Sequence, residues 1–396
     1  MTADQLGTKP KLMVCLVAGE PSGDILGARL MAALRAQWGD TVGFVGVGGE
    51  AMIGAGLKTF FSMSELSVMG LAEVLPHLRH LRRRLDDTEA AIHRIRPDVV
   101  VTIDSPGFTL RLQSRLLGMG IPRVHYVAPQ VWAWKPWRAR TLGRKVDCLL
   151  TLFPFEPSWF TPHGLPSHFV GHPVTESSPA VAGAAAFRRD HDIPSDAALL
   201  CVLPGSRKTE ITRLLPVFEA TVRRLAVKRP DLRITMPTLP DHAEILKRAT
   251  AAWPVPVHVT CGEESKTMAF AAADAALAAS GTVTLELAVA GVPTVVAYRL
   301  HPVTVGLARP FVRGKYASLA NILLNRPAQP EFLLGACKAK NLVPAVVEAL
   351  NDPKRREQAK TDAQALMAAL GNDEESPSHK AARHVLEIVA EAAAWP

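Results

Sequence analysis

The sequence lacks the patterns that mark a disulfide scaffold, a zinc site or a membrane-spanning protein. Its 396 residues include five cysteines, which are far apart, odd in number and nowhere spaced C-x-x-C. This usage indicates neither disulfides nor zinc and predicts a reducing, cytoplasmic compartment. No apolar run approaches the roughly 20 residues of a spanning helix, and the first ten residues do not resemble a secretion signal. Contact with a membrane is therefore expected only at its surface.

The patterns of common cofactor sites are missing as well. None of the 13 histidines stands in an H-E-x-x-H or comparable ligand spacing, so we expect no metal. There is also no matching G-x-G-x-x-G fingerprint with an acidic residue about 20 positions further on, which disfavours a dinucleotide. We therefore expect that the protein works without a cofactor.

The sequence does contain an excess of positive charge and enough apolar residues for two domains. Lysine and arginine number 45 against 37 acidic residues, which gives a net charge of +8, and the pI is near 9.4. This charge predicts an anionic partner, for which nucleic acid, nucleotide phosphates and acidic lipid all remain open. Apolar residues make up 48% of the chain, and its length favours two sizeable globular domains.

Short runs rich in valine and leucine alternate with amphipathic stretches of helical length, which predicts an α/β fold with parallel sheets. In the first half, strands are expected at 12–18, 42–47, 98–103, 123–127 and 146–152, and helices at 24–37 and 78–95. A stretch with prolines and serines predicts a linker near 173–183, and a second series of strands and helices follows over 198–298. We expect doubly wound domains over 1–178 and 179–365, and a C-terminal helix in 366–396 that packs back on the first.

Two turns in the first half follow strands directly, where ligands bind in open α/β sheets. The strand at 12–18 runs into G-E-P-S-G-D at 19–24, which fits a ligand-binding turn or a tight strand-to-helix turn with an N-cap. The strand at 98–103 ends at Asp104. A carboxylate there suits a general base for a substrate hydroxyl or, alternatively, the cap of the next turn.

Two turns in the second half have the character of phosphate sites. P-G-S-R at 204–207 leads from a strand into a helix, and its backbone amides and arginine suit a diphosphate, although a capping box is the alternative. S-G-T at 280–282 offers further phosphate donors. Glu286 follows about one turn inside the next helix and can accept hydrogen bonds from vicinal ribose hydroxyls, unless it is simply a buried glutamate at a helix start.

Two other segments have an unusual composition. Residues 125–138 hold three tryptophans, a histidine, a tyrosine and two basic groups, which fits a sugar or lipid platform or packing between domains. Residues 66–75 are apolar and lead into a basic stretch, as in an interfacial helix at a membrane or a core-facing helix with a solvated basic side. The arginines of that stretch are Arg79, Arg82, Arg83 and Arg84.

Eight motifs follow one another along the chain: V-A-G-E-P-S-G-D-I-L-G-A, S-V-M-G-L-A-E-V-L, I-D-S-P-G-F, H-Y-V-A-P-Q-V-W-A-W, F-P-F-E, F-V-G-H-P, L-P-G-S-R-x-x-E-I and A-A-S-G-T-V-T-L-E-L. Together they resemble the lipid A disaccharide synthase family over nearly the whole chain. The resemblance implies a GT-B glycosyltransferase, whose two Rossmann-like doubly wound domains face each other across a cleft.

The resemblance also implies a reaction and partners. UDP-2,3-diacylglucosamine would react with 2,3-diacylglucosamine 1-phosphate (lipid X), with inversion and without a metal, to give the β-1,6-linked disaccharide 1-phosphate and UDP. The enzyme would act as an intertwined homodimer on the cytoplasmic face of the bacterial inner membrane. Nucleic acid is then no longer expected as a partner.

Roles for individual residues follow from the same resemblance. Asp104 is the implied general base for the acceptor 6-hydroxyl. The implied UDP-sugar site consists of Gly205, Ser206, Arg207, Glu210, Ser280, Gly281, Thr282, Glu286 and Asn321. The implied acceptor side consists of Glu20, Ser22 and Asp24. The implied bilayer contacts are Val68, Met69, Leu71 and Leu75.

The chain departs from the family pattern at two places. Family members often carry P-E-x-L-Q, whereas P-E-F-L-L here puts Leu334 in place of the glutamine. The family's usual S-P-S-V-W-A-W is A-P-Q-V-W-A-W in this chain.

Two alternatives to the implied function remain. One is another GT-B enzyme of UDP-amino sugars, such as a UDP-N-acetylglucosamine transferase or 2-epimerase. The other is a non-catalytic nucleotide- or lipid-binding peripheral membrane protein, in which the carboxylates are caps.

Overall fold

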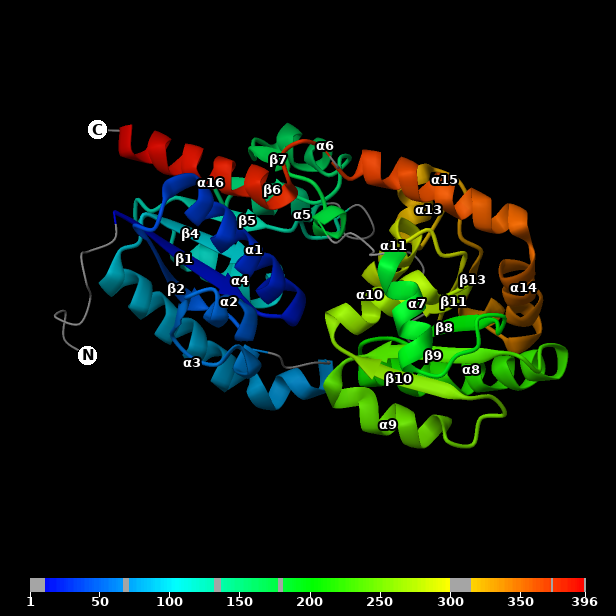
Figure 1. The fold of residues 1–396 in the computed structure, drawn as a ribbon. Helices are drawn as coiled ribbons and strands as arrows, with labels where there is room; N and C mark the ends of the chain where they lie inside the picture. The colour runs from blue at the N-terminus through cyan, green and yellow to red at the C-terminus, as the bar shows by residue number, and fades with distance from the viewer. Residues whose placement is uncertain are drawn as a thin grey trace. The chain divides into compact units, whose positions relative to one another are not determined.

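The chain forms two compact units, one of which is discontinuous in sequence (Figure 1). The computed structural model describes residues 11–66, 71–131, 137–176, 181–299, 315–371 and 373–394. The first unit comprises Met1–Glu176 and Leu370–Pro396, and the second comprises Ser177–Ala369. The C-terminal helix therefore belongs to the first unit.

A parallel sheet forms the centre of the first unit. Within the described residues its seven strands run in the order β3-β2-β1-β4-β5-β6-β7. They are β1 (Leu12–Ala18), β2 (Val42–Val47), β3 (Lys58–Thr59), β4 (Val99–Ile103), β5 (Arg123–Tyr126), β6 (Cys148–Thr151) and β7 (Ser167–Phe169). The strand order reverses between β1 and β4, which are direct neighbours. Doubly wound sheets bind ligands at such a reversal, outside the carboxyl ends of the strands.

Helices flank this sheet, and the last of them comes from the end of the chain. They are α1 (Pro21–Trp38), α2 (Glu50–Gly54), α3 (Leu71–Ile95), α4 (Pro106–Arg115), α5 (Arg138–Leu142), α6 (Pro157–Phe160) and α16 (Pro377–Ala394), with 3-10 turns η2 (Met63–Leu66), η3 (Thr161–His163) and η4 (Pro173–Glu176). Helix α16 packs along α1 (Figure 1). Ser378 donates hydrogen bonds from its backbone N–H (2.7 Å) and its Oγ (3.0 Å) to the carboxylate of Glu176, which fastens α16 to η4.

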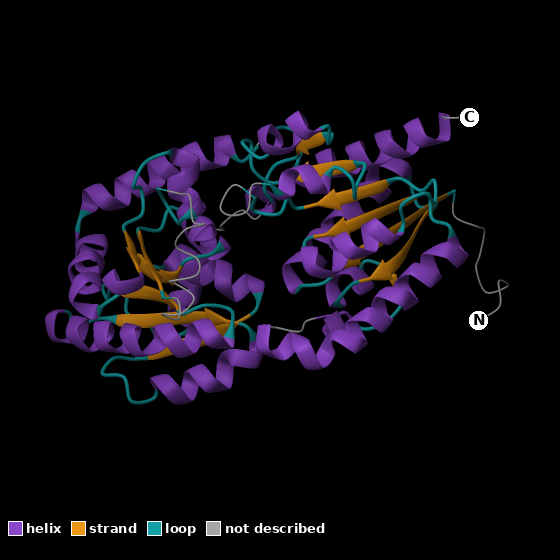
Figure 2. Ribbon diagram, turned by 180° about the vertical axis from the view of Figure 1, so that it is seen from behind, coloured by secondary structure: helices purple, strands orange, loops and turns teal. Residues whose placement is uncertain are grey.

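The second unit is built on the same plan, with helices around a parallel sheet (Figure 2). Its strands are β8 (Leu199–Leu203), β9 (Arg233–Thr238), β10 (Val257–Cys261), β11 (Ala275–Ala279), β12 (Thr294–Tyr298) and β13 (Glu331–Leu333). Its helices are α7 (Val181–Asp190), α8 (Lys208–Lys228), α9 (Pro240–Thr250), α10 (Glu263–Ala272), α11 (Thr282–Val289), α13 (Leu319–Leu324), α14 (Ala339–Asn351) and α15 (Pro353–Ala369), with the 3-10 turn η5 (Leu334–Ala336). The order β10-β9-β8-β11-β12-β13 reverses between β8 and β11. The predicted class, α/β with two doubly wound domains, is confirmed.

The strands of both sheets are buried along nearly their whole length, which explains their apolar composition. Every residue of β4, β8 and β11 is buried, as expected for parallel strands covered on both faces. In the second unit, Phe218 and Val222 of α8 share one core with strands β8 and β9 and with helix α14. Full burial of each such side chain stabilises the fold by about 1.5–3 kcal/mol.

The stretch predicted as a linker near 173–183 is in part helical. Helix α7 begins at Val181 and packs against α10. Its Phe187 is 1% exposed and shares a small apolar core with Leu199 and Ala269. The burial of this phenylalanine depends on residues far along the chain, so local composition did not reveal the helix. Strands β7 and β13, which have three residues each, were not predicted from the sequence either.

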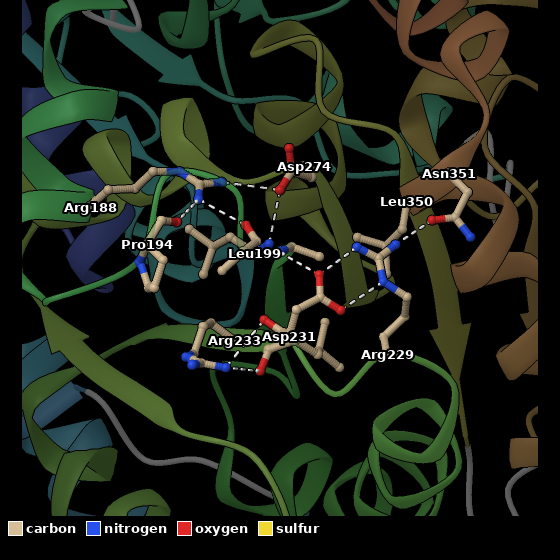
Figure 3. Close-up of polar contacts among 12 residues, drawn as sticks. Arg188, Pro194, Leu199, Arg229, Asp231, Arg233, Asp274, Leu350 and Asn351 are labelled. Carbon is tan, nitrogen blue, oxygen red and sulfur yellow. Dashed lines mark hydrogen bonds and ion pairs between the residues drawn. The ribbon is translucent and has the colours of Figure 1, made fainter.

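Ion pairs lie at the amino-terminal ends of strands in the second unit (Figure 3). Asp274 precedes β11 and accepts hydrogen bonds from the Leu199 backbone (2.9 Å) and from Arg188 (3.1 Å). Asp231 precedes β9 and accepts two from Arg229 (3.0 and 2.7 Å). The Arg229 guanidinium holds the pKa of the Asp231 carboxyl well below its usual range. These ion pairs stabilise the end of the sheet at which the strands begin, opposite to their carboxyl ends.

Candidate active site

Two phosphate-type turns lie next to each other at the strand reversal of the second unit. Residues 204–207 follow β8 and residues 280–282 follow β11, and these two strands pair directly. The first turn opens α8 and the second opens α11. Each helix N-terminus carries unpaired backbone N–H groups and a partial positive charge. Because both turns lie at the same sheet edge, the arrangement is suited to an anion.

The turn at 204–207 is closed by the carboxylate of Glu210. Its Oε2 accepts hydrogen bonds from the backbone N–H groups of Ser206 (3.2 Å) and Arg207 (3.4 Å). Gly205 has a φ of +124°, and a β-carbon there would lie 2.5 Å from the same oxygen, so the turn requires glycine. The capping alternative is thus present, with Arg207 at the N-cap. Glu210, predicted for the donor site, shapes the turn that would hold the donor.

Arg207 remains at the surface of this turn. Its side chain is 60% exposed and pairs loosely with Glu210, with an N···O separation of 3.8 Å. His242 of α9 donates from Nε2 to the carbonyl oxygen of Ser206 at 2.9 Å and supports the turn from a second helix. The guanidinium therefore stands where it can bind a diphosphate by two parallel hydrogen bonds.

The turn at 280–282 presents the second helix N-terminus. Gly281 and Thr282 are exposed, and Ser280 is half-buried. Glu286 lies one turn further along α11 with 28% of its side chain exposed, and its Oε2 is 2.8 Å from Nζ of Lys266. The predicted ribose acceptor therefore lies beside the phosphate-type turns and is paired with a lysine that was not predicted.

Asn321, predicted for the donor site, is fully buried and engaged at both ends of its amide. Its Nδ2 donates to the backbone carbonyl of Gln329 (2.8 Å) and to Glu331 Oε1 (2.7 Å), and its Oδ1 accepts from the Gln329 N–H (2.7 Å). Gln329 also donates to the carbonyl of Thr284 in α11 (2.9 Å). Asn321 thus belongs to a buried network that joins α13 to α11, and these contacts give no support to the predicted donor contact.

Leu334, in place of the family's glutamine, begins η5. Its φ is +52°, in the left-handed region that a leucine rarely occupies. The side chain lacks the amide with which a glutamine would reach a ligand, so the structure offers no replacement for that contact at this position.

In the first unit the strand order reverses between β1 and β4. This reversal brings Glu20 and Asp104 to the same end of the sheet, where the strands finish. Ala18 and Ile103, the last residues of β1 and β4, pair with each other. Glu20 lies two residues beyond Ala18, and Asp104 lies one residue beyond Ile103. The two turns are in contact, because a β-carbon on Gly19 would lie 2.5 Å from Ser105 Oγ. The sequence motifs at 19–24 and 104–107 therefore form one local site.

Asp104 has a strained backbone. Its φ is +48° and that of Ser105 is +47°, a conformation that costs a residue with a side chain roughly 1–2 kcal/mol. The Asp104 N–H donates to the carbonyl of Tyr126 (2.9 Å), and Thr109 Oγ1 donates to the Asp104 carbonyl (2.7 Å). The neighbouring strand and α4 thus hold the conformation. Strain of this kind clusters at active sites, which strengthens the hypothesis that Asp104 is the general base.

Asp24, predicted for the acceptor side, serves the fold. Its carboxylate is 6% exposed. It accepts hydrogen bonds from three backbone N–H groups at the start of α2, those of Gly49 (2.7 Å), Ala51 (2.9 Å) and Met52 (3.0 Å). These bonds cap the first turn of α2 and explain the burial of the charge. Ser22 is exposed and Glu20 half-buried, so the acceptor-side prediction now rests on these two residues.

The predicted bilayer contacts lie mostly where the structure gives no side chains. Val68 and Met69 fall outside the described residues, and Leu71 and Leu75 lie on α3 where only the backbone is described. The basic residues that follow on α3 are described. Arg79, Arg82 and Arg83 are exposed.

Arg84 differs from the other three arginines because it is bound within the first unit. It pairs with Glu65 (2.6 Å) and Asp87 (2.9 Å), and its guanidinium lies 4.9 Å from the centre of the Phe61 ring. The prediction that Arg84 meets an anionic headgroup therefore competes with partners that the fold already supplies.

The aromatic segment at 125–138 is described only in part, since residues 132–136 lie outside the described ranges. His125 and Tyr126 are fully buried in β5. His125 Nδ1 is 2.8 Å from Thr102 Oγ1, and burial lowers the pKa of this histidine to about 4. Trp137, at the start of α5, is 57% exposed. Packing thus accounts for the start of the segment, and a platform role remains a prediction for its tryptophans.

The described ranges contain no helix with the length and hydrophobicity needed to cross a bilayer. Within the same residues, histidine, cysteine, aspartate and glutamate form no cluster of three or more that could hold a metal ion.

Comparison with known proteins identifies the family. Residues 14–386 match the family model described as lipid-A-disaccharide synthetase. The chain belongs to this family. It is 49% identical to a lipid-A-disaccharide synthase of Rhodospirillum centenum, over 96% of this chain and 95% of the relative. It is 46% identical to the lipid-A-disaccharide synthase of Paramagnetospirillum magneticum, over 96% of this chain and 98% of that relative.

Solved structures with the same fold are distant in sequence. MurG of Acinetobacter baumannii is 15% identical, with a TM-score of 0.56 over 96% of this chain and 99% of that one. A UDP-GlcNAc 2-epimerase of Neisseria meningitidis, bound to UDP-GlcNAc, is 12% identical, with a TM-score of 0.65 over 96% and 100%. At these identities the likeness establishes the fold alone, and it confirms the predicted GT-B architecture.

Family membership decides the class of activity. The protein is a glycosyltransferase that forms the lipid A disaccharide, as predicted from its motifs. Neither the other UDP-amino-sugar enzymes nor a non-catalytic binding protein is favoured.

Several residues at the site were not predicted, because their partners are distant in sequence. His242 reaches Ser206 from α9, and Gln329 reaches Thr284 from the segment before β13. Lys266 had one local signal, its i,i+3 spacing from Glu263, which is typical of a surface ion pair on a helix. That spacing did not indicate that the lysine also contacts Glu286.

Proposed function

We propose that the protein transfers 2,3-diacylglucosamine from UDP to the 6-hydroxyl of lipid X, with inversion and without a metal. The products are UDP and the β-1,6-linked disaccharide 1-phosphate. The observation that carries the proposal is the proximity of two phosphate-type turns, at 204–207 and 280–282, at one strand reversal. Two helix N-termini with an exposed arginine suit a nucleoside diphosphate better than they suit a neutral sugar.

In this proposal the second unit holds the donor. The backbone amides of Gly205, Gly281 and Thr282 and the guanidinium of Arg207 bind the diphosphate, and Glu286 accepts hydrogen bonds from the ribose hydroxyls. As the bond between the anomeric carbon and the phosphate oxygen breaks, negative charge grows on UDP. Arg207 and the two helix N-termini stabilise that charge, which is why no metal is required.

The first unit supplies the base. The acceptor oxygen attacks the anomeric carbon as the bond to UDP breaks, and the Asp104 carboxylate takes the hydroxyl proton. A single displacement of this kind inverts the anomeric configuration. General base catalysis contributes about 10²–10⁴-fold to such a step, and the strained turn around Asp104 supports its assignment. Glu20 and Ser22 bind the acceptor beside it.

We also place the protein at the cytoplasmic face of the bacterial inner membrane, as a homodimer. Support for the membrane location comes from Arg79, Arg82 and Arg83, which are all exposed on helix α3. Each arginine near an anionic membrane surface contributes about 1 kcal/mol to the attraction between the protein and the membrane. The acyl chains of both substrates require such a location.

The test is an incubation of the purified protein with UDP-2,3-diacylglucosamine and lipid X, with and without EDTA, followed by mass spectrometry. We expect the disaccharide 1-phosphate and one UDP per disaccharide in both samples. Release of a free or epimerised sugar from UDP-GlcNAc, without the disaccharide, would indicate the epimerase alternative. Absence of the disaccharide under both conditions would refute the proposal, and its loss with EDTA alone would refute the metal-free reaction.

A further inference from the structure

Lys266 bridges two carboxylates beside the turn at 280–282. Its Nζ is 2.8 Å from Oε2 of Glu286 and 2.8 Å from Oε2 of Glu263. The Lys266 and Glu286 side chains are 24% and 28% exposed, whereas Glu263 is 67% exposed. Burial opposes the charge on Lys266, but attraction to Glu286 and Glu263 outweighs it and raises the pKa of the lysine. Of the two carboxylates that Lys266 contacts, Glu286 is therefore the one that is more shielded from solvent.

The bridge joins two helices that share one core. Lys266 lies on α10, four residues before Phe270, and Glu286 lies on α11 next to Leu287. Phe270 and Leu287 belong to the same apolar cluster as residues of β8 and β11. Because this core fixes the backbones of both helices, the ion pair mainly determines where the Glu286 carboxylate points.

A carboxylate that receives two ribose hydroxyls must keep its lone pairs available. It offers about four lone-pair positions, and Lys266 occupies one of them. Without the lysine, Glu286 would be a long, partly buried side chain with several rotamers, and binding of a ribose would have to order it.

We propose that Lys266 is a positioning residue for the nucleotide sugar, which orients the Glu286 carboxylate toward the ribose hydroxyls. This inference rests on the proposed function, because it takes Glu286 as the ribose acceptor. Lys266 then affects the binding of nucleotides that carry these hydroxyls. It does not take part in proton transfer, so its loss raises the KM for the donor much more than it lowers kcat.

Two other roles for Lys266 predict different results. A purely structural tie between α10 and α11 would affect stability and leave nucleotide affinity unchanged. A direct contact of Nζ with the diphosphate would affect every uridine diphosphate equally, with or without ribose hydroxyls.

The experiment compares UDP with 2′,3′-dideoxy-UDP by titration calorimetry of the full-length protein. We expect Lys266→Met to weaken UDP binding about tenfold, within the range of a hydrogen bond to a charged group, and to leave dideoxy-UDP binding unchanged. Lys266→Arg should recover most of the UDP affinity, because it restores the ion pair. The matched control is Lys247→Met on α9, whose pair with Glu244 is exposed, and it should change neither affinity.

A second comparison tests whether Lys266 acts through Glu286. In a Glu286→Gln background, Lys266→Met should weaken UDP binding no further, since the two residues form one unit. If Lys266→Met does not fold, Lys266→Gln takes its place in both comparisons.

Unchanged UDP affinity in Lys266→Met, or an equal loss for both nucleotides, would overturn this inference and leave the proposed function standing. Failure of the unaltered protein to bind UDP would overturn the proposed function and this inference with it.

Discussion

Gly19 lies so close to Ser105 that a β-carbon on the glycine would stand 2.5 Å from Ser105 Oγ and 2.8 Å from Ser105 Cβ. Ser105 is also the second of two consecutive residues with a left-handed backbone, of which Asp104 is the first. The absence of a side chain at Gly19 thus lets the turn after β4 approach the turn after β1. The position of Asp104 depends on this contact.

Gly19→Ala should therefore displace Ser105 and Asp104 together. We expect kcat to fall at least tenfold and the free energy of unfolding to fall by about 1–3 kcal/mol, as for other overpacked sites. UDP affinity should not change, because the proposed nucleotide site lies in the second unit. The control is Gly54→Ala on α2, where no atom lies within 4 Å of the added carbon. Full activity of Gly19→Ala, measured by disaccharide formation, would contradict the role given to this contact.

Arg207 should determine affinity for the diphosphate. Arg207→Gln removes a charged donor, and we expect UDP to bind about 10–100-fold more weakly, since a hydrogen bond to a charged group contributes about 1.5–3 kcal/mol. Titration calorimetry at two salt concentrations provides the measurement, and the loss should shrink as salt increases. Arg223→Gln serves as the control, because Arg223 lies on the same helix with 50% of its side chain exposed. Equal effects of the two substitutions would argue against a specific phosphate contact.

Asn321→Ala should destabilise the fold more than it weakens UDP binding. The substitution removes the side-chain partners of the buried Gln329 backbone N–H and carbonyl and one of the hydrogen bonds to Glu331. We expect the free energy of unfolding to drop by about 1–3 kcal/mol. Urea unfolding measures this loss, and calorimetry with UDP measures affinity at a temperature where the variant is folded. A large loss of affinity with unchanged stability would restore the donor contact predicted for Asn321.

The protein should lose stability in mild acid because of buried histidines. Burial, aided by the nearby charge of Arg29, lowers the pKa of His172 to about 4 from an ordinary 6.5. The unfolded chain therefore binds a proton that the folded chain does not between pH 6.5 and 4. Stability is complete above this window and falls as the pH decreases through it, by about 2 kcal/mol for this residue at pH 5.

His172→Asn tests this pH dependence. The Nδ1 of His172 accepts a hydrogen bond from the Val174 N–H (3.1 Å), and the asparagine Oδ1 can take its place without titrating. Urea midpoints at pH 7.5 and pH 5 should differ less in the variant than in the unaltered protein. An unchanged difference would show that His172 does not cause the acid sensitivity.

The sequence predicts the long elements of both sheets well, because burial on two faces demands continuous apolar runs. β1 and β2 have the predicted bounds, and β4 and β5 differ from the predicted strands by one residue at one end. β13 was not predicted, since it has three half-buried residues at the edge of its sheet. Helix α7 was not predicted either, because its core partners come from α10 and β8.

At the candidate site, the sequence located the turns but not the contacts that specify each side chain's role. Asp24 and Asn321 matched family positions, yet the structure shows both engaged with backbone groups and side chains from other segments. Lys266 lies 20 positions before Glu286, and nothing local links the two residues. Such pairs form only when strand order brings their helices together, and residue spacing carries no information about that order.

The most direct test of the account is the turnover of Asp104→Asn with UDP-2,3-diacylglucosamine and lipid X, measured beside UDP affinity of the same protein. Asparagine tolerates the left-handed backbone at this position but cannot take the acceptor proton. We expect kcat to fall by about 10²–10⁴-fold, while UDP binds as tightly as to the unaltered protein. Normal turnover by Asp104→Asn would contradict the account and point to Glu20 as the base.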